Sequence, residues 1–170
     1  MFKCPLIHLG KGSLGKLSTL RGERALIVAG KNLSQLGVVG EVEKRLQAAK
    51  MNVKVFDEVE PDPNDLIVSN CAKIATEFKP DWFVGLGGGS PIDVAKAAFL
   101  LYERPDVKLS SFIPLGEYGL RKKSKLAAMS SPSFRLCAGE RCVGVPPPQC
   151  ICLIFLTPML CFRIDSSRPR

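Results

Sequence analysis

The chain has 170 residues, 46% of them hydrophobic and 24% charged, so it is long enough to bury a core and has the composition of a globular protein. Its formal net charge is +8, but basic and acidic residues are interspersed and the longest basic cluster, 121–123, has no interleaved aromatics. This pattern argues against a nucleic-acid partner. The best candidate for a membrane span, 151–162, contains Pro158 and is shorter than the ~20 apolar residues that a spanning helix needs.

The N-terminus has no signal-peptide pattern, so we expect a cytoplasmic protein without a membrane partner, in which the seven cysteines are thiols. Strands and helices then alternate along the first three quarters of the chain. Strands are expected at 24–29, 53–56 and 82–86, and helices at 38–49, 62–78 and 91–102, the second helix capped by Asp62. This alternation predicts the α/β class, with a Rossmann-like parallel sheet and flanking helices.

The composition changes abruptly near residue 130. The 14 lysines all lie before this point, whereas five of the seven cysteines and six of the thirteen prolines follow it. Pro146-Pro147-Pro148 is incompatible with a helix, and no helical or strand period continues beyond about residue 130. We therefore expect a folding unit at 1–129 and an irregular, disordered tail at 130–170. The tail is either a real extension or a segment read out of the original frame.

The third expected strand runs directly into a glycine turn, Gly87-Gly88-Gly89-Ser90, and then into a helix. Glycine adopts positive φ at little cost and allows a ligand to approach the backbone. Ser90 is a suitable N-cap, Pro91 suits the first helical position, and Asp93 would complete a capping box. Free amides at such a helix start attract anions, so the segment predicts a phosphate site, and the alternative is a tight turn without a ligand.

A second glycine pattern competes with this turn. Gly10-Lys11-Gly12-Ser13-Leu14-Gly15 matches G-x-G-x-x-G after an apolar strand, but the pattern alone is weak. The acidic residue expected about 20 positions later is replaced by Gly30. A simple turn is the better interpretation of residues 10–15.

Residues 87–96, Gly-Gly-Gly-Ser-Pro-Ile-Asp-Val-Ala-Lys, closely resemble the signature of the iron-containing (group III) alcohol dehydrogenases, relatives of the dehydroquinate synthases. Segments 9–13, 25–33 and 60–63 also resemble this family, so the resemblance covers about residues 5–129. It implies an N-terminal NAD(P)-binding domain that, in the family, is joined to a helical domain holding a divalent metal. Members oxidise alcohols or reduce aldehydes.

By this resemblance, Gly88, Gly89 and Ser90 would contact the pyrophosphate of the dinucleotide, and Asp93 would lie close to the cofactor. Gly87 and Lys96 also match the signature and are expected among the cofactor-binding residues, without a more specific role. NAD-using members carry an aspartate for the adenosine ribose after the strand at 25–28. Here that place is taken by Gly30 and Lys31, which favours NADP slightly over NAD because a 2′-phosphate would meet no carboxylate and a nearby cation.

The family's metal, Fe²⁺ or Zn²⁺, is held by one aspartate and three histidines, and this chain has only His8, which we expect to be an ordinary strand residue. The spacings Cys137-x4-Cys142 and Cys150-x-Cys152 do not match a zinc site either. We therefore expect no catalytic or metal-binding residues and a truncated dehydrogenase that is inactive alone. The alternative is a non-catalytic nucleotide-binding fragment, which exposed apolar surface would cause to self-associate.

Overall fold

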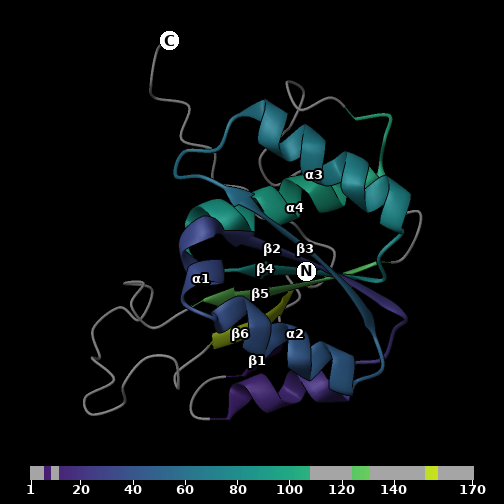
Figure 1. Ribbon diagram of the computed structural model, residues 1–170. Coiled ribbons are helices and arrows are strands. Elements are labelled where there is room, and N and C mark those ends of the chain that lie inside the picture. The colour runs from purple at the N-terminus through teal and green to yellow at the C-terminus, as the bar shows by residue number, and fades with distance from the viewer. Residues whose placement is uncertain (1–5, 9–11, 108–123, 131–151, 157–170) are drawn as a thin grey trace.

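The computed structural model describes residues 6–8, 12–107, 124–130 and 152–156, which form a single twisted sheet covered by helices (Figure 1). The sheet has six strands in the order β1-β6-β5-β4-β2-β3. Their bounds are β1 Leu6–His8, β2 Arg24–Gly30, β3 Asn52–Val59, β4 Trp82–Leu86, β5 Lys125–Ser130 and β6 Cys152–Leu156. The four strands β3-β2-β4-β5 are mutually parallel, which confirms the predicted Rossmann-like parallel sheet.

Helices cover both faces of this sheet (Figure 1). Helices α3 (Asp65–Phe78) and α4 (Gly89–Glu103) lie on one face, and α2 (Val38–Ala48) lies on the other beside the 3-10 helix η1 (Ser13–Thr19). Strand β2 serves both layers because its side chains alternate in direction: Leu26 and Val28 pack under α3 and α4, while Ile27 packs under α2. Burial on both faces explains the continuous apolar sequence of this strand.

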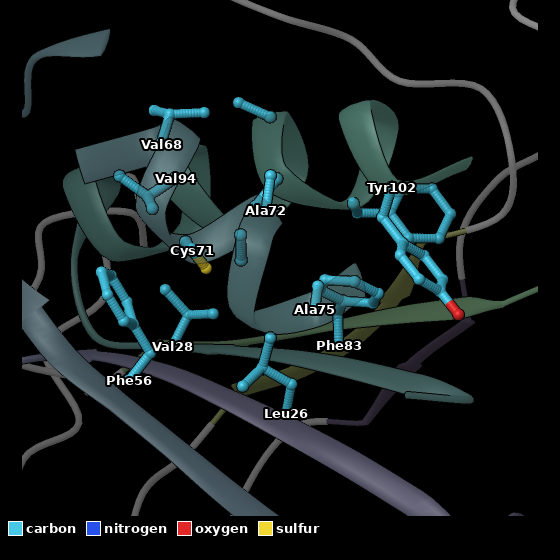
Figure 2. Close-up of a cluster of buried hydrophobic side chains, with 14 of the residues drawn as sticks. Leu26, Val28, Phe56, Val68, Cys71, Ala72, Ala75, Phe83, Val94 and Tyr102 are labelled. Carbon is cyan, nitrogen blue, oxygen red and sulfur yellow. The ribbon is translucent and has the colours of Figure 1, made fainter. Parts of the chain in front are cut away.

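The layer under α3 and α4 holds most of the buried aromatic side chains (Figure 2). Phe83 of β4 lies edge-on to Phe99 of α4, with ring centroids 5.4 Å apart, and its ring also lies 5.6 Å from that of Tyr102. Cys71 of α3 is buried in the same layer as a free thiol (Figure 2). These contacts fix α4 on β4, and so fix the position at which α4 begins.

Strand β6 corrects the expectation of an irregular tail. Residues 152–156 pair antiparallel with β5 on one side and with β1 on the other, with Ala128 opposite Ile154 and Ile7 opposite Ile154. The tail therefore contributes a strand to the sheet, and the prediction of irregular structure is wrong for these five residues. The remainder of 130–170 lies outside the described residues, and among those that are described no helix is long and apolar enough to cross a membrane.

The start of α3 also differs from the prediction. Asn64 is the N-cap, and its side chain accepts a hydrogen bond of 3.1 Å from the amide of Ile67. Asp62, the predicted cap, lies two residues earlier with φ of 58°, so Asp62-Pro63 forms the turn that precedes the helix. Asn64, which lies nearer the helix than Asp62, is the residue whose side chain satisfies the free amide.

Candidate dinucleotide site

The glycine turn lies where the order of the parallel strands reverses direction. From β2 the chain passes through α1 (Lys31–Gln35) and α2 to β3 on one side, whereas from β4 it passes through α4 to β5 on the other. In open α/β sheets, ligands bind at the carboxyl ends of the two strands that flank such a switch point. Here those ends are Gly30 of β2 and Leu86 of β4, and the glycine turn follows the second of them.

Gly87 makes the turn possible. Its φ is +133°, and a Cβ atom built on it would lie 2.9 Å from Leu33 Cδ1 and 3.2 Å from Pro91 Cγ. Its amide donates a 2.8 Å hydrogen bond to the carbonyl oxygen of Met129 in β5. Gly87 is thus required by the backbone and by its neighbours, and its amide is already used by the protein.

The next residues present their amides freely. Gly88 is the N-cap of α4, with φ of −82° and ψ of −159°, and no side chain caps the helix within the described part of the chain. Ser90 lies inside the helix, so the prediction that Ser90 is the N-cap and Asp93 its capping-box partner is wrong. Pro91 follows as the third helical residue and has no amide that would need a partner. The backbone N–H groups of Gly88, Gly89 and Ser90 remain as donors at the positive end of the helix dipole.

Gly89 supplies the most specific sign of a ligand. A Cβ atom built on it would have nothing within 4 Å, and its φ is not in the left-handed region. Neither packing within the described residues nor backbone strain therefore requires glycine at this position. A glycine that the fold does not need, at the start of a helix with free amides, fits close approach of a phosphate group to the backbone.

Asp93 and Lys96 form an ion pair with each other one turn into α4. Lys96 Nζ lies 3.0 Å from Asp93 Oδ1; the lysine side chain is 17% exposed and the aspartate side chain 49%. The pair places a compensated charge beside the first turn rather than a free cation. The structure brings both residues to the same end of α4 as the glycine turn, as the sequence predicted.

Gly30 and Lys31 lie at the neighbouring strand end. Gly30 is paired with Val59 of β3, and a Cβ atom on it would lie 3.2 Å from the carbonyl oxygen of Val59. Lys31 begins α1, and its Nζ lies 3.2 Å from Glu60 Oε1 in an exposed ion pair. The sequence reasoning did not identify Glu60, because only the register between β2 and β3 places it beside Lys31.

Gly85 is a further residue that sequence reasoning missed. It lies inside β4, and a Cβ atom on it would lie 3.0 Å from Ala95 Cβ and 3.1 Å from Ile92 Cα. The absence of a side chain there lets α4 approach β4 closely, a packing role that glycine also has in dinucleotide-binding folds. A glycine inside an otherwise apolar strand was the available sequence signal.

The competing glycine pattern at 10–15 forms a different structure. Gly12 has φ of 89° and precedes the short 3-10 helix η1, and the amide of Gly15 bonds to the carbonyl oxygen of Gly12 at 2.9 Å. The first two residues of the pattern, 10 and 11, lie outside the described residues. His8 is a strand residue of β1, as expected.

The likeness to known proteins agrees with this geometry. A family model described as iron-containing alcohol dehydrogenase matches residues 5–133. The chain belongs to this family. Iron-containing alcohol dehydrogenases that it is similar to include the NADPH-dependent butanol dehydrogenase of Clostridium saccharobutylicum, 40% identical over 133 residues that make up 75% of this chain and 33% of that protein. A bifunctional aldehyde-alcohol dehydrogenase of Escherichia coli is 40% identical over 104 residues, 59% of this chain and 12% of that protein.

Among solved structures, an iron-containing alcohol dehydrogenase from Thermotoga maritima superposes with a TM-score of 0.51 at 34% identity, over 56% of this chain and 27% of that one. The chain thus spans between 12% and 33% of the length of these three relatives.

The residues of this chain do not fit the metal of the family. The resemblance implies three histidine ligands, and the sequence has one histidine, His8. No cluster of three or more histidine, cysteine, aspartate or glutamate side chains occurs in the described ranges, and Asp165 and most of the cysteines lie outside them. The sequence therefore lacks the three histidines that the resemblance implies for the metal.

Proposed function

We propose that this chain is the dinucleotide-binding part of an iron-containing alcohol dehydrogenase, with the pyrophosphate of the cofactor bound at Gly88, Gly89 and Ser90. The observation that carries the proposal is the uncapped start of α4 at the β2/β4 switch point. Two or three amide hydrogen bonds and the helix dipole, itself worth about 0.3–1 kcal/mol, would act on the same anion. When bound, the cofactor supplies hydride exchange between an alcohol and an aldehyde.

The proposal includes a modest preference for NADP over NAD. Gly30 occupies the position where NAD-using members carry the aspartate that binds the ribose hydroxyls, so no carboxylate is present there. Lys31 adds a cation next to this position. The similarity to an NADPH-dependent butanol dehydrogenase supports this preference. The cytoplasm, where both dinucleotides occur, is the proposed location.

We expect no turnover from these 170 residues alone. Hydride transfer needs the nicotinamide, the substrate and an electrophile held together, and this chain has no histidine set to hold the metal. The same observation favours a second candidate, a fragment that binds nucleotide without catalysis. Aldehyde reduction measured with NADPH and added Fe²⁺ or Zn²⁺ tests this expectation: metal-dependent turnover would exclude the non-catalytic fragment and contradict our expectation of inactivity.

Dinucleotide binding itself is tested by Gly89→Ala. A methyl group at this position meets open space in the protein, so the variant should fold normally, but the methyl group would project where the phosphate approaches. Gly40→Ala on α2 is a matched control, because its Cβ atom also meets nothing within 4 Å and its φ is not positive. We expect calorimetry to show NADP binding to the wild type and to Gly40→Ala, and at least tenfold weaker binding to Gly89→Ala, about 1.4 kcal/mol. Equal affinities in all three would place the cofactor elsewhere.

A further inference from the structure

The ion pair between Lys31 and Glu60 lies at the end of the site where the adenosine ribose would be bound. The register of β2 and β3 sets Gly30 opposite Val59, so Lys31 and Glu60 are the next residues at two adjacent strand ends. Their charged atoms are 3.2 Å apart, and the side chains are 61% and 62% exposed. Neither charge is buried, so either group is able to exchange its partner for a ligand.

We propose that Glu60 is a specificity-determining residue that weakens the preference of this site for NADP by competing for Lys31. The inference rests on the proposed function, because it presumes that a dinucleotide occupies the glycine turn. A 2′-phosphate has up to two negative charges and several acceptor oxygens, so it forms a stronger partner for the lysine than one carboxylate does. To gain that partner it must displace Glu60, and it then lies near a carboxylate that repels it.

The unphosphorylated ribose of NAD experiences neither effect. It has no charge to attract Lys31 and none for Glu60 to repel, so the ion pair stays intact when NAD binds. The ion pair therefore weakens the binding of NADP and leaves the binding of NAD nearly unchanged. This accounts in physical terms for a site whose glycine and lysine favour NADP, but only slightly.

The test uses calorimetric titration of the full chain with NADP and with NAD. Glu60→Gln keeps the size and a hydrogen-bonding amide but removes the charge, and we expect it to bind NADP about two- to fivefold tighter, as for removal of one exposed charge interaction. Affinity for NAD should stay the same. Lys31→Met should weaken NADP binding. Adding Glu60→Gln to Lys31→Met should tighten NADP binding less than Glu60→Gln does in the wild type, because only the repulsion by the carboxylate is then relieved and no ion pair has to be displaced.

Glu77→Gln is the matched control for net charge. Glu77 is exposed near the end of α3, where the carbonyl oxygen of Phe78 accepts a 3.1 Å hydrogen bond from Arg24 at the amino end of β2, opposite to the end that carries Gly30. Glu77→Gln should change the affinity for neither dinucleotide at ~0.15 M salt, because interactions between exposed charges more than about 8 Å apart are largely screened.

The outcomes separate the two proposals. If the wild type binds NADP and Glu60→Gln binds it no tighter, the role of Glu60 is wrong and the dinucleotide site stands. If Glu60→Gln weakens NAD binding instead, Glu60 grips a ribose hydroxyl and the proposal is likewise overturned. If the folded wild type binds neither dinucleotide, the proposed function fails, and this inference fails with it.

Discussion

Replacing Gly85 by alanine tests whether close packing of α4 on β4 stabilises this fold. The added Cβ atom would lie 3.0 Å from Ala95 Cβ and 3.1 Å from Ile92 Cα, and neither atom can move by a change of rotamer. The helix must therefore shift by a few tenths of an ångström, and overpacking of this kind costs about 1–3 kcal/mol. Restricting the unfolded chain returns about 0.4–1 kcal/mol, so we expect the free energy of unfolding to fall by about 1–2 kcal/mol.

Urea unfolding followed by circular dichroism gives this free energy, and Gly40→Ala provides the control. The alanine methyl meets open space on α2, so the same change there should raise the free energy of unfolding by about 0.5–1 kcal/mol. The two substitutions are thus expected to have opposite signs. If Gly85→Ala were as stable as Gly40→Ala, α4 would not be held against β4 as the structure describes, and the position of the helix start would lose its support.

Three further predictions concern residues outside the glycine turn. Burial raises the pKa of the Cys71 thiol from 9.0 to about 12, so above pH 9 the unfolded chain loses a proton that the folded chain keeps, and stability falls by up to about 1.4 kcal/mol per pH unit. Between pH 8 and 10 the urea midpoint should decline less steeply with pH for Cys71→Ala than for the wild type. An equal decline in the two proteins would contradict this prediction. Asp81 Oδ2 accepts two backbone hydrogen bonds of 2.7 and 3.0 Å at the start of β2. Asp81→Ala should therefore lower the free energy of unfolding by about 1–2 kcal/mol. An unchanged free energy of unfolding in urea would show that these bonds do not stabilise the fold. Asn64→Ala removes the N-cap of α3 and should lower the free energy of unfolding by about 1 kcal/mol. Asp62→Ala leaves this cap in place and should not cause the same loss.

The parallel part of the fold could be predicted from the sequence because its signals are local. The apolar runs of β2 and β4 and the stripe of α3 each identify one element, and their alternation determines the class. Strand β6 could not be found in this way. The sequence Cys-Leu-Ile-Phe-Leu has no alternation, and its place between β1 and β5 depends on pairing with residues 22 to 149 positions away, which no local pattern encodes.

The candidate site also has parts that local sequence signals predict and parts that depend on long-range pairing. The turn at 87–90 and the pair Asp93 and Lys96 follow from one contiguous segment, and the sequence located them together. The cap was misassigned because Ser90 is a good capping residue by type, whereas in the structure the extended residue Gly88 precedes the helix, which already begins at Gly89. Glu60 was missed because it approaches Lys31 only through the register of two strands.

The proposed dinucleotide binding and the metal chemistry of the family depend on different residues. The glycine turn is held by β4 and α4, and by the bond from the Gly87 amide to Met129 in β5, which ends at Ser130. Strand β6 pairs with β5 on the side away from β4, so the change of composition after residue 130 leaves the elements that form the turn intact. Metal chemistry, in contrast, requires histidines that no rearrangement of these 170 residues can supply. A chain with this distribution of residues is therefore expected to bind a dinucleotide independently and to need a metal-bearing domain for any hydride transfer.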